Sequence, residues 1–175
     1  QSGLLHLFGI KRLERLLPDI PSMEPLKNYY PAVQKQADQK KTADVSLFAG
    51  CLGSVFDRDA LLAAIRLLTH CGYGVHIPHN QVCCGALHLH EGRAIQAQQL
   101  ANQNLETCNA FDVEALLFTA SGCGAVLSEY PLLEKKNTFN APVMDISHFL
   151  ASVKWPNDMV FTPLEEDVVI HDPFS

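Results

Sequence analysis

The stretch VSLFAGCLGSVFDRDALLAAIRLLTHCGYGVHIP, residues 45–78, contains the pattern that decides the fold. It begins with the apolar run VSLFAG, which ends in a glycine turn and is typical of a buried parallel strand. Residues 56–72 begin with acidic side chains, carry leucine and isoleucine at helical spacing, and end at a glycine, so they predict an amphipathic helix. YGVHIP, residues 73–78, predicts a second strand.

The same alternation continues toward the C-terminus. A helix is predicted for 92–111, a strand for 114–120, a further helix from 121, a short strand and helix within 141–152, and a last strand within 167–175. Alternating strands and helices indicate an α/β fold with a mainly parallel sheet flanked by helices, in Rossmann-like layers. The order of the strands does not follow from this pattern.

The segment before residue 45 differs in character. LLHLFGIKRLERLLPDIP, residues 4–21, predicts a short amphipathic helix that ends at Pro18 and Pro21. Residues 22–44 carry more prolines with a cluster of lysines and glutamines, which is typical of an extended arm or linker. We therefore expect an N-terminal helical and extended arm over 1–44, followed by the α/β domain.

Composition limits the function classes. A chain of 175 residues with 47% apolar and 18% charged residues suits one globular domain with an appendage. The net charge of −6 and the lack of a basic run argue against nucleic acid as a partner. No stretch reaches the ~18 apolar residues that a membrane span needs, and the N-terminal residues lack the features of a signal peptide. We expect a cytoplasmic protein.

Six cysteines in a reducing compartment favour metal or redox chemistry over a disulfide framework. Cys51 follows the first predicted strand, the adjacent Cys83 and Cys84 follow the second, and Cys123 follows the third. Ligands bind beyond the carboxyl ends of parallel strands, so we expect these thiols to converge at one edge of the sheet. Adjacent cysteines rarely pair with each other, because the small ring strains the disulfide. Glycines that permit tight turns flank all three positions, namely Gly50, Gly53, Gly85, Gly122 and Gly124.

Other candidate residues are weaker. His88 and His90 lie shortly after the cysteine pair and could ligate a metal or hydrogen-bond a cluster, although a helix-capping or partner-facing role is an equal alternative. Cys71 at a helix end and Cys108 on an apolar stripe are interpreted as small buried hydrophobes. His76 alternates with apolar residues and is interpreted as a core or edge residue.

Four thiolates suit an iron–sulfur cluster or zinc. The chain has neither the CxxC pairs of zinc ribbons nor the CxxCxxC run of bacterial ferredoxins, so its spacing favours an unusual cluster, with zinc as the alternative. A single thiolate activated by a histidine for nucleophilic catalysis is a further alternative, but it leaves three sulfurs unexplained.

Three motifs resemble a known family. FAGC at 48–51, VCCGALHLHEG at 82–92 and TASGCGAVLSEY at 119–130 are similar to the cysteine-rich CCG domain, in the branch that includes the iron–sulfur subunits of bacterial glycolate oxidases and is related to heterodisulfide reductase subunits. PDIPSMEPLKNYYPA, 18–32, resembles the linker before the first such domain. The resemblance implies a CCG domain over 45–165 and the start of a truncated second one over 166–175, where Phe174 replaces a common cysteine.

The resemblance also implies a function. It indicates an electron-transfer domain that relays electrons from flavin-containing 2-hydroxy-acid dehydrogenase subunits towards quinone, at most peripheral on the inner face of the membrane and not catalytic alone. Cys51, Cys83, Cys84 and Cys123 match ligands of a four-iron four-sulfur cluster, which is noncubane in heterodisulfide reductase relatives. Ala120 replaces a fifth cysteine of the fuller motif, which favours an ordinary cubane cluster, or no cluster at all, over the noncubane type. The alternative function is a zinc-holding module that docks the dehydrogenase subunits. Glycolate, lactate and glycerol-3-phosphate all remain open as substrates of the complex.

Overall fold

The computed structural model describes residues 24–33, 42–133, 138–163 and 165–169. Its centre is a five-stranded sheet with the order β1-β3-β2-β4-β5. The strands are parallel except β1, which pairs antiparallel with β3 at one edge. Their bounds are β1 Tyr29–Tyr30, β2 Asp44–Phe48, β3 Gly74–His76, β4 Leu116–Phe118 and β5 Val143–Asp145.

Strand β2 occupies the centre of the sheet. Its residue Ser46 lies opposite His76 of β3 on one side and Leu116 of β4 on the other. The chain runs from β2 outward to β3 and then crosses β2 to reach β4, so the strand order reverses beside β2. In an open parallel sheet, the crevice beyond the strand ends at such a reversal is the usual place for a ligand.

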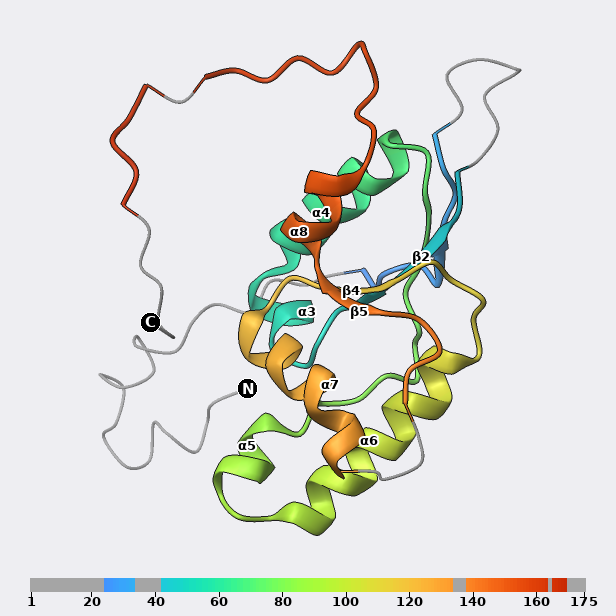
Figure 1. Cartoon of the computed structure of the whole chain (residues 1–175), viewed down its shortest axis with the longest axis vertical. Coiled ribbons are helices and arrows are strands. Elements are labelled where there is room, and N and C mark those ends of the chain that lie inside the picture. The colour runs from blue at the N-terminus through green and yellow to red at the C-terminus, as the bar shows by residue number, and fades with distance from the viewer. Residues whose placement is uncertain (1–23, 34–41, 134–137, 164, 170–175) are drawn as a thin grey trace, which may run out of the picture.

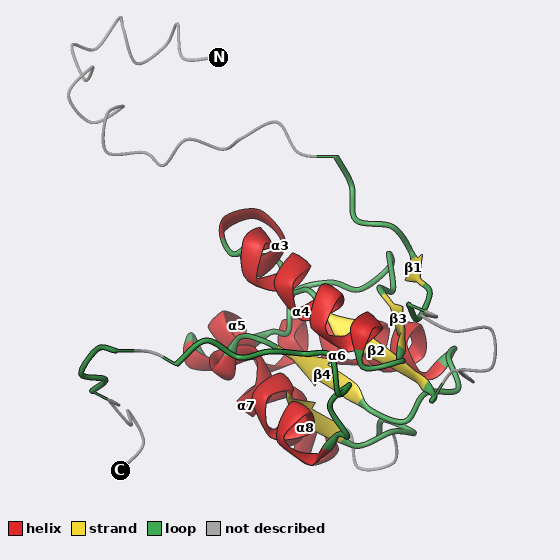
Figure 2. Cartoon of the chain, turned by 90° about the horizontal axis from the view of Figure 1, so that it is seen from above, coloured by secondary structure: helices red, strands yellow, loops and turns green. Residues whose placement is uncertain are grey.

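Helices cover both faces of the sheet. Figure 1 shows α4 and α8 on one face and α6 and α7 on the other, which makes three layers, and Figure 2 looks down on the same layers from above. No helix among the residues that the structure describes is long and apolar enough to cross a membrane. The helices are α3 Gly53–Phe56, α4 Arg58–His70, α5 Ala86–His90, α6 Ala94–Asn109, α7 Ser121–Leu133 and α8 Ile146–Ser152.

Each face of the sheet has its own apolar core, because side chains alternate along a strand. Leu47 of β2 faces a cluster that includes Leu68 of α4 and Phe149 of α8. Its neighbour Phe48 faces a second cluster, which includes Leu127 of α7 and residues of α6. Each fully buried leucine contributes about 1.5–3 kcal/mol. The predicted α/β fold with a mainly parallel sheet is confirmed.

One strand of the sheet comes from the predicted arm. Tyr29 and Tyr30 form β1, and the Tyr29 hydroxyl donates to Asp44 Oδ1 at 3.2 Å. The Tyr29 ring also lies 4.6 Å, between centroids, from that of His76 on β3. The surrounding prolines obscure this short strand in the sequence.

Both ends of the chain contain predictions that the structure does not test in full. The predicted helix 4–21 lies outside the described residues. Residues 165–169 contain no strand, and the remainder of the predicted last strand, 170–175, also lies outside the described part of the chain.

Candidate functional site

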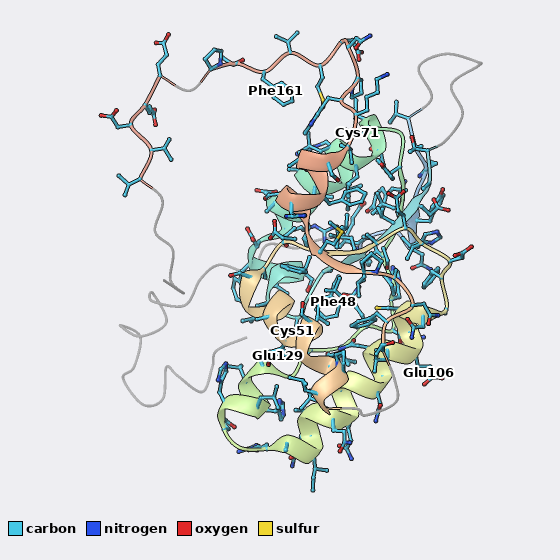
Figure 3. The ribbon with its side chains drawn as sticks, in the orientation of Figure 1. Phe48, Cys51, Cys71, Glu106, Glu129 and Phe161 are labelled. Atoms are coloured by element: carbon cyan, nitrogen blue, oxygen red, sulfur yellow. The ribbon has the colours of Figure 1, made fainter. Side chains whose placement is uncertain are left out.

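Four cysteines line one cavity of about 260 Å³ beyond the carboxyl ends of β2, β3 and β4. Cys51 lies in the turn after β2, Cys83 and Cys84 lie in the loop after β3, and Cys123 lies in the first turn of α7. Figure 3 labels Cys51 close to Phe48, the last residue of β2. The structure therefore brings together the four thiols that the strand-end argument selected. That they hold a cofactor stays a prediction.

The wall around the thiols is apolar. No charged side chain of the described residues lines the cavity. Besides the four cysteines, the lining consists of Phe48, Ala49, Gly50, Leu52, Gly53, Ala86, Leu87, Phe118, Ala120 and Gly122.

Two glycines shape the loops that carry the thiols. Gly50 has a φ of 69°, and a Cβ there would lie 3.7 Å from Cys123 Sγ. Gly85 has a φ of 91°, and a Cβ there would lie 3.4 Å from Ala97 Cα of α6. Other residue types rarely adopt this left-handed conformation. Glycine thus allows the cysteine loops to approach each other and α6 closely.

A buried polar network holds the backbone of the cysteine pair. The Val82 N–H donates to Asn104 Oδ1 at 2.8 Å. Asn104 Nδ2 lies 3.1 Å from the Cys83 carbonyl oxygen and 3.0 Å from the Tyr130 hydroxyl. That hydroxyl in turn donates to the Cys84 carbonyl oxygen at 2.9 Å. Asn104 and Tyr130 are both 0% exposed, and burial raises the pKa of Tyr130, so its hydroxyl stays protonated.

Sequence reasoning missed this network. Asn104 lies on the buried side of α6, next in sequence to the buried Leu105. A polar residue in an otherwise apolar helical stripe was the available signal, because buried amides are normally hydrogen-bonded.

Gln81 joins two of the cysteine loops. Its Oε1 accepts from the Ala49 N–H at 2.8 Å and from the Gly50 N–H at 3.4 Å. Its Nε2 donates to the Pro78 carbonyl oxygen at 2.8 Å. The turn that carries Cys51 is therefore tied to the loop that carries the cysteine pair.

The thiols interact in a row: Cys51 with Cys83, Cys83 with Cys84, and Cys84 with Cys123. The pKa of Cys84 is raised by a hydrogen bond with the Cys123 thiol and by burial, while the same hydrogen bond lowers the pKa of Cys123. Partial burial and a hydrogen bond with Cys83 raise the pKa of Cys51. Four thiolates this close would repel one another, and the uncharged wall offers them no counter-charge. A metal centre bound there would supply the positive charge that all four need in order to ionise.

Backbone N–H groups point at three of the sulfurs. The Gly85 N–H donates to Cys83 Sγ at 3.5 Å. The N–H groups of Leu52 and Ala86 make hydrogen bonds with Cys51 and Cys84, respectively. Such donors stabilise negative charge on sulfur.

The other two cysteines lie elsewhere, as expected. Cys71 belongs to the core cluster beside α4 and is well separated from Cys51 (Figure 3). Cys108 belongs to the cluster beside α6, where burial raises its pKa to about 12. Both behave as small buried side chains.

The histidines do not join the cavity. His88 and His90 lie on α5, and neither lines the cavity. Within the described parts of the chain, His88 Nδ1 is buried without a hydrogen-bond partner, whereas His90 is exposed. Across the same residues, no three His, Cys, Asp or Glu side chains are arranged to hold a single metal ion. His76 Nε2 of β3 lies instead 3.5 Å from Asp44 Oδ2 of the neighbouring strand β2.

A second cavity, of about 420 Å³, shares Cys51 and Cys83 with the cysteine cavity. Residues of the N-terminal arm line one side of this second cavity. Arg58 Nη2 donates to the Glu24 carbonyl oxygen, and His79 Nε2 lies 2.8 Å from the Leu26 carbonyl oxygen. The linker-like composition of the arm gave no signal for this contact.

Comparison with known proteins finds a family and several relatives. The family model described as "Cysteine-rich domain", CCG, matches residues 45–128. The "Probable glycolate oxidase iron-sulfur subunit" of Bacillus subtilis is 36% identical over 137 residues, which are 77% of this chain and 30% of that protein. An uncharacterized iron-sulfur protein of Methanocaldococcus jannaschii is 31% identical over 156 residues, 89% of this chain and 29% of that protein.

A third relative belongs to another enzyme. It is a subunit of the fumarate reductase (CoM/CoB) of Methanothermobacter marburgensis, and it is 30% identical over 136 residues, 77% of this chain and 26% of that protein. The chain thus spans less than a third of each of these three relatives. No solved structure gives a significant match to the chain.

Proposed function

Residues 45–128 belong to the cysteine-rich CCG domain family, and from this premise we propose that the chain is an iron–sulfur domain that relays single electrons within an oxidoreductase complex. One observation carries the proposal: four cysteines from three separate strand ends line a single apolar cavity. The relative named as an iron–sulfur subunit of glycolate oxidase supports it.

The size of the cavity supports a cluster over a single zinc ion. A structural zinc ion is held directly by four ligands about 2.0–2.3 Å away in a tetrahedron. The cavity of about 260 Å³ is far larger than the roughly 10–15 Å³ that one water molecule requires. An iron–sulfur cluster, when bound, supplies reversible one-electron transfer.

The residues of the chain have distinct parts in this proposal. Cys51, Cys83, Cys84 and Cys123 hold the cluster through their thiolates. The backbone N–H groups beside them stabilise negative charge. No acid or base other than the thiols lines the cavity among the described residues, which supports electron relay rather than bond-making.

Ala120 bears on the type of cluster. It lines the cavity with its methyl group, at the position where the fuller motif has a fifth cysteine. We therefore propose a four-iron four-sulfur cluster with four thiolate ligands.

The wider assembly follows from the resemblance. We propose that flavin-containing dehydrogenase subunits donate the electrons, that quinone receives them, and that the complex lies in the cytoplasm or on the inner face of the membrane. Glycolate is the favoured substrate through the name of one relative, of which this chain spans 30%.

Metal analysis tests the proposal. The chain is purified without oxygen and reconstituted with iron and sulfide. Iron, sulfide and zinc are then measured per chain, together with the electron paramagnetic resonance of the reduced form. We expect about four irons with matching sulfide. The Cys84→Ser variant should lose them, whereas Cys108→Ser, a matched change in the adjacent core, should retain them.

Two results would contradict the relay. Zinc near one per chain without a reducible signal would favour the docking module. In the assembled complex, Cys84→Ser should abolish electron transfer while the subunits stay together, and dissociation of the subunits would again favour docking.

A further inference from the structure

The peptide group between Cys84 and Gly85 makes a hydrogen bond at each end. Its carbonyl oxygen accepts from the Tyr130 hydroxyl at 2.9 Å, and its N–H donates to Cys83 Sγ at 3.5 Å. The peptide is planar and trans, so its C=O and N–H point in opposite directions. A residue that fixes the carbonyl thereby fixes the direction of the N–H.

Tyr130 is well placed to fix that carbonyl. It is 0% exposed, its ring stacks on Phe139 with centroids 5.5 Å apart, and its hydroxyl also contacts Asn104 Nδ2 at 3.0 Å. Asn104 holds the preceding carbonyl, that of Cys83, at 3.1 Å. Neither side chain lines the cysteine cavity, so each acts through the backbone.

We propose that Tyr130 and Asn104 are positioning residues that hold the Cys84–Gly85 peptide with its N–H toward Cys83 Sγ, and so set the reduction potential of the cluster; this rests on the proposed function. A peptide turned the other way would direct a carbonyl oxygen toward that sulfur and repel its negative charge. The left-handed conformation of Gly85, with φ 91°, leaves such rotation sterically open to the backbone. The two side chains are what select one orientation.

The test uses the Tyr130→Phe variant, which retains the ring and loses only the hydroxyl. Tyr73→Phe is the matched control, because Tyr73 is also buried but packs in the other core cluster. In the reconstituted protein, Tyr130→Phe should retain its iron but show a more negative midpoint potential than the wild type, since a donor to sulfur raises the potential. Tyr73→Phe should leave the potential unchanged.

A second readout needs no cluster. In the reduced, metal-free chain, the Gly85 amide proton should exchange with solvent about fivefold faster in Tyr130→Phe, as expected for the loss of one hydrogen bond. The Gly92 amide, which donates to the Leu89 carbonyl at 3.0 Å, is the internal reference and should not change. The Asn104→Leu variant, whose side chain has a similar volume, should also speed up exchange of the Gly85 amide proton, because it removes the hydrogen bond between Asn104 and the Tyr130 hydroxyl.

The two measurements separate this proposal from the proposed function. An unchanged Gly85 exchange rate in both variants would overturn the positioning role, whether or not iron is bound. An unchanged potential in an iron-loaded Tyr130→Phe protein would also overturn it. If the wild type takes up no iron, the proposed function fails, while faster Gly85 exchange still supports the backbone role of Tyr130 and Asn104.

Discussion

Gly85 illustrates how one residue type places the cysteine pair. Its φ of 91° costs other residues about 1–2 kcal/mol, and a Cβ there would lie 3.4 Å from Ala97 Cα of α6. We expect Gly85→Ala to lower the free energy of unfolding by about 1–2 kcal/mol through backbone strain, because the added Cβ makes only ordinary contacts with Ala97. Urea denaturation of the reduced chain measures this change.

Gly92→Ala is the control for that experiment. Gly92 has a similar φ of 73°, but a Cβ there would meet no atom within 4 Å, so only the backbone cost applies. The difference between the two variants isolates the contact with α6. We expect similar losses in the two variants, and a clearly larger loss in Gly85→Ala would contradict backbone strain as the main cost at position 85.

Cys108 should make stability depend on alkaline pH. Burial raises its native pKa to about 12 from an ordinary value of 9.0. Between these values the unfolded chain loses the proton and the native chain keeps it, so stability is present below pH 9 and is lost as the pH rises toward 12. The slope from this group approaches about 1.4 kcal/mol per pH unit.

The Cys108→Ala variant removes that contribution. Urea denaturation of both proteins at pH 8, 9 and 10, with reductant, gives the difference in free energy of unfolding. We expect the free energy of unfolding of the wild type to fall relative to that of the variant as the pH rises above 9. A constant difference across this range would show that the Cys108 thiol ionises as freely in the native chain as in the unfolded one.

The four thiols of the cavity could be selected from the sequence, but the residues that hold them could not. Strand-end positions are visible because apolar runs end in Gly and Cys, and parallel strands bring those ends together. Asn104, Gln81 and Tyr130 act through hydrogen bonds to backbone groups distant in sequence. No periodic pattern marks such contacts. The proximity of His88 to the cysteine pair along the chain likewise did not place it in the cavity.

Helix α7 packs on β4 through a glycine. A Cβ on Gly124 would overlap the ring of Phe118, the last residue of β4. Because α7 also carries Cys123, this contact sets the position of one thiol relative to the sheet. We expect Gly124→Ala to lower the free energy of unfolding by about 1–3 kcal/mol through overpacking, as measured by thermal denaturation.

Gly122→Ala is the matched change in the same helix. No atom lies within 4 Å of a Cβ on Gly122, and alanine favours a helix by about 0.5–1 kcal/mol over glycine. This variant should therefore be as stable as the wild type or more so. If the two alanines had the same effect, helix propensity rather than the approach of α7 to Phe118 would explain position 124.

Elements with long periodic patterns were predictable, and so were the short strand β5 and helix α8 within 141–152, whereas α3, α5 and β1 were not. The predicted segments around α4, α6 and α7 match the observed helices, because several turns repeat one apolar face. The helices α3 and α5 are too short to repeat an apolar face, and β1 has only two residues. The strand order is also absent from local patterns, since it depends on which strands pair across long stretches of chain.

At the scale of the whole molecule, the cavity joins three loops that are far apart in sequence. Cys51, Cys83 with Cys84, and Cys123 follow β2, β3 and β4, which lie side by side in the sheet. A group bound by all four thiols would cross-link these strand ends. Unfolding would then have to break those bonds, so binding free energy becomes folding free energy.

Removal of the bound group should therefore destabilise the entire domain. We expect the anaerobically reconstituted chain to unfold at a temperature about 5–10 °C above the chelator-stripped chain, as for a gain of about 2.7 kcal/mol in a protein of this size. Scanning calorimetry of both forms measures the difference. Cys51→Ser should shrink this gain, because one loop is released, whereas Cys71→Ser should preserve it. Equal melting temperatures of the loaded and stripped wild type would show that the four thiols do not bind one common group that cross-links the strand ends.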